Sequence, residues 1–100
     1  MLRITRLDAL GQVTLKLEGC LIGPWVKETE TAWRSAQSVL KGRPLIMDIK
    51  CVDRVDQAGF YLLSLLYVNG VRFVASGALM IELVESIEKD WSGHEDEYIH

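Results

Sequence analysis

The chain contains few of the residues on which most enzymes and metal sites depend. It has two cysteines and two histidines, and both histidines lie at or beyond position 94. Cys20 and Cys51 lack the spacing of metal ligands and are too few for a disulfide framework. No histidine is placed to activate a nucleophile such as Ser64, and no glycine-rich phosphate loop occurs. We therefore predict a non-catalytic protein with no metal and no cofactor.

Long apolar runs and basic clusters are also missing. No segment approaches the roughly 18 apolar residues of a membrane span, and "MLRITRLD" lacks the apolar core of a signal peptide. These features predict a cytoplasmic protein without a membrane span. No basic stripe with interleaved aromatics is present, so we expect no nucleic-acid binding.

The net charge of −3 is concentrated near the C-terminus. Residues 88–100 contain five acids against a single lysine, and the charges beyond Lys89 show no helical period. The sequence therefore predicts one domain over residues 1–89, followed by a frayed acidic tail over residues 90–100.

Period-two alternation marks the first strands. Val13, Leu15 and Leu17 alternate with polar residues over 12–19, and the similar segment 2–7 precedes them across the turn "DALGQ". We expect these two segments to form an antiparallel pair. The nearly continuous apolar run over 44–49 indicates a strand covered on both faces, and 71–75 indicates another short buried strand.

Three segments have helical periodicity. The first begins at Pro24 and is expected to stop at Gly42 and Pro44. The second runs over 58–68, and the third over 76–87 with Ser76 as its N-cap. The expected apolar stripes are Val26, Thr29, Trp33, Ala36 and Leu40 in the first helix, and Ala58, Leu62, Leu65 and Leu66 in the second. The order β-β-α-β-α-β-α predicts an α/β fold with a mixed, mainly parallel four-stranded sheet packed with helices.

The junction "VDRVDQAG", residues 52–59, is the main candidate site. Asp56 is suited to cap the helix that follows, and Gly59 permits close approach of another segment of backbone. Asp53 and Asp56 together suggest either a carboxylate pair for acid–base or metal chemistry, or loop solvation plus a cap. The absence of a third ligand nearby favours the cap. Helix starts at the carboxyl ends of parallel strands are common contact sites.

The segments "VTLKLEGCLIGPW", "PLIMDIKCVDRVDQAGFYLLSLL" and "NGVRFVASGALMIELVESI" resemble the STAS domain, over Val13 to Ile87. This is the fold of anti-sigma factor antagonists and of the cytoplasmic tails of sulfate transporters. In its switch members, a cognate histidine-kinase-like serine kinase phosphorylates a serine immediately before the glycine. The resemblance places Ala58 at that position, and the preceding Gln57 cannot accept a phosphate either.

The resemblance implies a protein-binding regulatory module of the anti-sigma factor antagonist type, without the usual phosphorylation switch. We expect its contact residues to be Arg54, Asp56, Gln57, Ala58, Gly59 and Trp25. Its partner would be an anti-sigma factor or serine kinase-like protein, or a subunit of a transporter or sensor.

An alternative function is an accessory subunit of a transport or sensor complex that binds a nucleotide, with Lys50 and Arg54 supplying positive charge. Cys20 and Cys51 are each expected just past a strand, as small apolar residues or as a redox pair. The sequence leaves the oligomeric state open.

Overall fold

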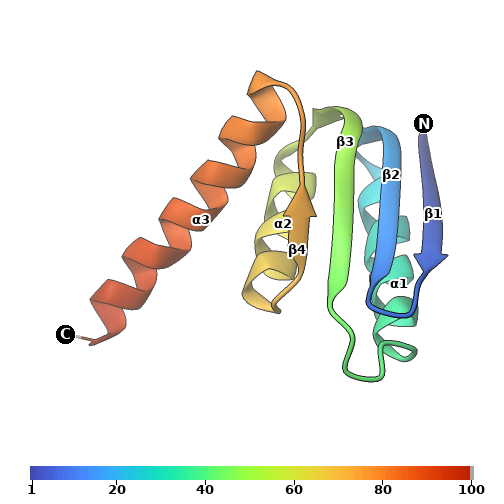
Figure 1. Ribbon diagram of the computed structural model, residues 1–100. Helices are drawn as coiled ribbons and strands as arrows, with labels where there is room; N and C mark the ends of the chain where they lie inside the picture. Colours follow the sequence, from blue (N-terminus) through green and yellow to red (C-terminus); the bar gives the residue numbers. More distant parts are fainter. Residues whose placement is uncertain (100) are drawn as a thin grey trace.

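A computed structural model describes the backbone of residues 1–99 and the side chains of residues 1–90. Seven elements follow one another along the chain (Figure 1). They are β1 (Leu2–Asp8), β2 (Val13–Leu21), α1 (Pro24–Gln37), β3 (Leu45–Val55), α2 (Gln57–Val68), β4 (Arg72–Val74) and α3 (Ala78–Ile99). The predicted order β-β-α-β-α-β-α is confirmed.

The four strands form one mixed sheet in the order β1-β2-β3-β4. β1 pairs antiparallel with β2, and the β2–β3 and β3–β4 pairs are parallel. Figure 1 shows α1 and α2 behind one face of this sheet, while α3 leaves the β4 edge at an angle. The predicted α/β fold class is therefore confirmed, including the antiparallel strand at one edge.

The core lies between the sheet and the helices on its covered face. Val13, Leu15 and Leu17 of β2 are buried there, as the alternation predicts, together with Met47 and Ile49 of β3. On the other face of β3, Ile46 and Asp48 are only half-buried. The prediction that this strand is covered on both faces is wrong, because α1 and α2 pack on the same side of the sheet.

Several predicted boundaries are corrected. α1 ends at Gln37, before the turn at Lys41 and Gly42, where the backbone φ angles are 50° and 85°. β2 extends to Leu21 and β3 to Val55, because their ladder continues past register shifts to the pairs Cys20↔Arg54 and Leu21↔Val55. Cys20 and Cys51 therefore lie within strands rather than after them.

The last two elements also differ from the prediction. β4 has only three residues and is an edge strand, so Arg72 and Val74 are exposed instead of buried. α3 begins at Ala78, two positions after the predicted cap Ser76, and its backbone stays helical to Ile99. Residues 90–99 thus continue this helix. The proposed division between residues 89 and 90 remains a prediction.

The buried stripe of α2 is rotated from its predicted position. Gly59, Leu62, Leu63 and Leu66 are buried, whereas Ala58 and Leu65 are exposed. The prediction is confirmed for Leu62 and Leu66, whereas Leu63 and not Leu65 is the third leucine in the core. The rotation leaves part of this apolar helix facing outward.

We expect Leu63→Ala to lower the free energy of unfolding by about 2–5 kcal/mol, because Leu63 is fully buried and its truncation leaves a cavity. The matched variant Leu65→Ala should cost less than about 1 kcal/mol, because this side chain is 42% exposed. Urea unfolding measures both changes. Equal losses would contradict the observed stripe.

Candidate functional site

The Asp56 carboxylate joins the starts of two helices. Its Oδ1 accepts a hydrogen bond from the Gly59 amide at 2.8 Å, which caps α2. Its Oδ2 accepts a second hydrogen bond, also of 2.8 Å, from the amide of Gly23, the residue before α1. The Asp56 amide donates to the Leu21 carbonyl at 3.3 Å. The predicted cap is confirmed, and one side chain also ties the β2–α1 junction to the β3–α2 junction.

Gly59 lies where α2 passes very close to the end of β2. A Cβ atom built on Gly59 would lie 2.5 Å from the Leu21 carbonyl oxygen and 2.9 Å from a Val55 methyl carbon. The first contact is with backbone, which cannot move aside as a flexible side chain can. Gly59 therefore sets the distance between α2 and the sheet, as the close approach predicted from the sequence requires.

The same hydrogen bonds stabilise the charged form of Asp56. The Gly23 amide, and next the Gly59 amide, hold the pKa of the Asp56 carboxyl below its ordinary value of 3.8, although desolvation opposes them. The carboxylate is therefore ionised at neutral pH. Each of its oxygens already accepts a hydrogen bond from an amide at a helix start. The charged Asp56 side chain therefore has a structural role, which is to stabilise the starts of α1 and α2.

An apolar groove runs between α1 and α2 beside this junction. Its volume is about 490 Å³. α1 contributes Val26, Lys27 and Glu30, α2 contributes Ala58, Tyr61, Leu62 and Leu65, and Gly23 completes the lining. Ala58, the position that resembles the phosphoserine site of STAS switch proteins, thus lies on the wall of this groove. The charged side chains of the groove, Lys27 and Glu30, both come from α1.

The predicted contact residues are only partly brought together. Ala58 lines the groove, and Gln57 is exposed next to it, with its Nε2 donating to the Tyr61 hydroxyl at 2.8 Å. Arg54 is exposed near the end of β3, and Trp25 is half-buried against the core. Neither of these last two lines the groove.

Tyr61 and Lys27 are groove residues that the sequence reasoning missed. Tyr61 follows Ala58 at helical spacing, so the pair was a usable signal for a shared face. No sequence pattern indicates Lys27, because only the packing of α1 beside α2 brings it to the groove.

The other sequence hypotheses receive little support from the geometry. Asp53 is exposed within β3, and no cluster of three possible metal ligands occurs among the described residues. The Nζ atom of Lys50 lies 3.8 Å from Oδ2 of Asp48, with which it forms an ion pair. Neither Lys50 nor Arg54 lines the groove between α1 and α2. Cys20 and Cys51 are free thiols, opposite Arg54 and Glu18 rather than opposite each other.

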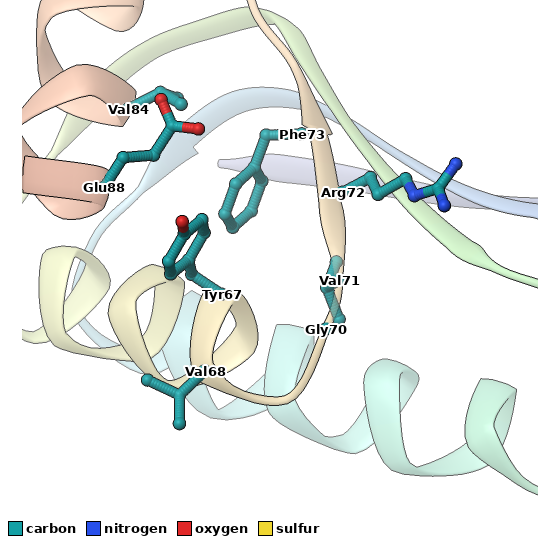
Figure 2. A pocket seen from close by; sticks show the side chains of 8 residues that line it. All are labelled: Tyr67, Val68, Gly70, Val71, Arg72, Phe73, Val84 and Glu88. Atoms are coloured by element: carbon teal, nitrogen blue, oxygen red, sulfur yellow. The ribbon is translucent and has the colours of Figure 1, made fainter. Parts of the chain in front are cut away.

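A second hollow, of about 530 Å³, lies at the far end of α2. Figure 2 shows the rings of Tyr67 and Phe73 facing Val84 and Glu88 of α3, while Arg72 points away. None of the contact residues predicted from the sequence lines it. It is therefore separate from the junction at Asp56.

Comparison with solved structures identifies the fold. The anti-sigma factor antagonist SpoIIAA in its unphosphorylated form is similar, with a TM-score of 0.59 and 16% identity over 85% of this chain and 82% of that one. An uncharacterised protein from the DUF3478 family of Shewanella loihica PV-4, described as having a SpoIIAA-like fold, gives a TM-score of 0.53 and 14% identity. That match covers 98% of this chain and 78% of the other. The chain has a STAS-like fold.

A third similar structure, Mglu, gives a TM-score of 0.57 and 21% identity over 73% of this chain. The match covers only 19% of the Mglu chain, so this fold corresponds to a small part of that protein. No family model matches the sequence, and no curated protein does. Within residues 1–99, no helix combines the length and apolar character needed to cross a membrane.

We expect Gly59→Ala to lower the free energy of unfolding by about 1–3 kcal/mol, because its methyl group would overlap the Leu21 carbonyl. Gly11→Ala is the matched control, since nothing lies within 4 Å of the added carbon and the change should stay within about 0.5 kcal/mol. Urea unfolding compares the two variants. A tolerated Gly59→Ala would show that α2 does not need this close approach.

The lowered pKa of Asp56 predicts a specific pH dependence. Its carboxylate stabilises the fold above the ordinary value of 3.8, and this contribution is lost as pH falls through 3.8 toward the lower pKa of the folded state. Asp56→Asn should therefore be less stable than wild type at neutral pH and lose less stability on acidification. Denaturant midpoints along a pH series test this. Parallel curves for the two proteins would contradict it.

Proposed function

We propose that this chain is a non-catalytic regulatory module, of the anti-sigma factor antagonist type, that binds a protein partner through the β3–α2 junction and α2. The observation that carries the proposal is the groove between α1 and α2, which Ala58 lines and whose α2 wall is mainly apolar. The similarity to SpoIIAA, an anti-sigma factor antagonist, supports the class of partner.

The outer face of α2 supports a protein rather than a small ligand as the occupant. Tyr61, Leu65 and Val68 are 61%, 42% and 50% exposed, and with Ala58 they follow helical spacing along one stripe. Clustered exposed apolar residues typically mark interaction sites, and tyrosine is enriched at interface hot spots. The stripe lengthens the groove into a surface that another helix can cover.

The chemistry at Ala58 makes this surface permanently competent to bind. A phosphate in the first turn of α2 would be favoured by the helix dipole but repelled by the ionised Asp56 carboxylate. Ala58 has no hydroxyl, so the surface keeps the uncharged character that the unphosphorylated state has in switch members. Regulation would then depend on expression or on a companion protein.

The proposed partner is an anti-sigma factor or serine kinase-like protein, or a subunit of a transporter or sensor, and the proposed setting is signalling or transcriptional regulation in the cytoplasm. Nucleotide binding remains a prediction, and the positions of Lys50 and Arg54 away from the groove do not favour it.

We expect Ala58→Glu to abolish capture of the partner from native lysate, because it places a charge on the groove wall. Tyr61→Ala should weaken capture of the same protein at least about tenfold, as loss of an interface aromatic residue does. Quantitative mass spectrometry of the captured protein measures both effects.

Two variants serve as controls for this experiment. Ala58→Ser adds a hydroxyl without charge and should retain the partner. Leu79→Ala removes another exposed apolar side chain, 74% exposed on α3, and should also retain it. Undiminished capture by Ala58→Glu would place the interface elsewhere.

A further inference from the structure

The first strand leaves one edge of the sheet unpaired. β1 has seven residues, Leu2–Asp8, and within the described part of the chain its one neighbouring strand is β2. Figure 1 shows this edge on the side of the sheet away from α3. The opposite edge, β4, has only three residues. Proteins often keep edge strands short to avoid unwanted pairing, and β1 lacks this protection.

The register of β1 shows which backbone groups face outward. The Cys20 amide donates to the Met1 carbonyl and the Ala9 amide to the Gln12 carbonyl, and both bonds fit the register in which Leu2 faces Gly19. Hydrogen-bonded pairs alternate along an antiparallel ladder. The odd-numbered residues of β1 therefore bond to β2, and the amides and carbonyls of Leu2, Ile4 and Arg6 point to the free edge.

A groove of about 540 Å³ follows this edge between β1 and α1. Ile4, Leu15 and Ala32 form its apolar part. Arg6, Glu28, Thr31 and Ser35 supply polar groups around it. The helix wall consists mainly of small side chains, so it leaves room for another element beside α1.

We propose that a second copy of this chain occupies the β1 edge, by antiparallel pairing of β1 with β1 about a twofold axis at Thr5. This register pairs the whole strand: Thr5 faces Thr5, Leu2 faces Asp8, Arg3 faces Leu7, and Ile4 faces Arg6. The outward groups of Leu2, Ile4 and Arg6 then form ladder hydrogen bonds, and one continuous sheet passes through both copies.

One pair of opposite charges across the interface supports a second copy, namely Arg6 of that copy and Glu28. No two like charges are directly opposite in this register, although each strand carries Arg3, Arg6 and Asp8. Arg6 of the second copy comes beside Ile4, in the groove that Glu28 also lines. Glu28 makes no ion pair within the described residues, so its carboxylate is available to that arginine.

The wall of α1 gives a further reason. An extended peptide would satisfy the edge of β1 but would bring no helix to the small residues Thr31, Ala32 and Ser35. A second copy brings its own α1 to the same side of the sheet, where the two helices meet along this wall. This contact is on the opposite flank of α1 from the groove at Ala58, so the inference stands independently of the proposed function.

Sedimentation equilibrium over a micromolar concentration series tests the proposal. We expect wild type to be a dimer that dissociates on dilution. Arg6→Pro removes an outward amide without breaking the ladder to β2, and should raise the dimer dissociation constant at least about tenfold relative to Arg6→Ala. Circular dichroism checks that both variants fold. A monomeric wild type at all concentrations, or equal dissociation constants for the two variants, would overturn the proposal.

Cross-linking tests the register itself. In a chain with Cys20→Ser and Cys51→Ser, a Thr5→Cys substitution should give a disulfide-linked dimer, because facing residues across a non-hydrogen-bonded pair are close enough for a disulfide. Thr14→Cys, on the same face of the neighbouring strand β2, should stay monomeric under the same oxidation. Equal cross-linking at both positions would contradict pairing at Thr5.

Discussion

The arrangement of this protein depends on one anchor, the half-buried carboxylate of Asp56 between the Gly23 and Gly59 amides. Each oxygen accepts one 2.8 Å hydrogen bond, and the two donors belong to the starts of α1 and α2. Helix starts leave amides without partners inside the helix, and a carboxylate there also interacts favourably with the helix dipoles. One ionised side chain therefore fixes both helices over the carboxyl end of the sheet and sets the groove between them.

The requirement for a glycine at position 59 follows from the same arrangement. Once Asp56 holds the first turn of α2 against the end of β2, the Leu21 carbonyl lies where a side chain at position 59 would begin. The two residues act together, since the cap sets the helix position and the glycine makes that position sterically possible. Chemistry that needs a free carboxylate at Asp56 would compete with this structural role.

The sequence was sufficient for the element order and the cap of α2, because each depends on local chemistry. It also predicted close approach at Gly59, although the contact there, with the Leu21 carbonyl, is tertiary. Alternation in β2 and turn residues between segments carry the same kind of local information. The phase of α2 could not be read in this way, because "FYLLSLLYV" is apolar on nearly every side and only packing selects Leu63 over Leu65 for the core. The polar end of β3 resembled a loop, since Lys50, Asp53 and Arg54 occupy a strand with exposed positions.

The groove at Ala58 also depended on packing that the sequence does not reveal. Ala58 and Tyr61 share a helix, but Val26 and Lys27 reach the groove only because α1 lies beside α2. The resemblance to the STAS domain predicts a phosphoserine-like position at Ala58, and the shape of the groove around Ala58 comes from the packing of the two helices.

The two proposed surfaces are geometrically compatible through α1, which has the Ala58 groove on one flank and the β1 groove on the other. A twofold axis through paired β1 strands is perpendicular to the sheet, so the covered faces of both copies point the same way. The paired molecule would then present two Ala58 grooves on one side. A partner that is itself dimeric would engage both, and the second contact would form at high effective concentration. Such bivalency offers a route to tight binding by the proposed surface, at which Ala58 has no hydroxyl to carry a phosphate.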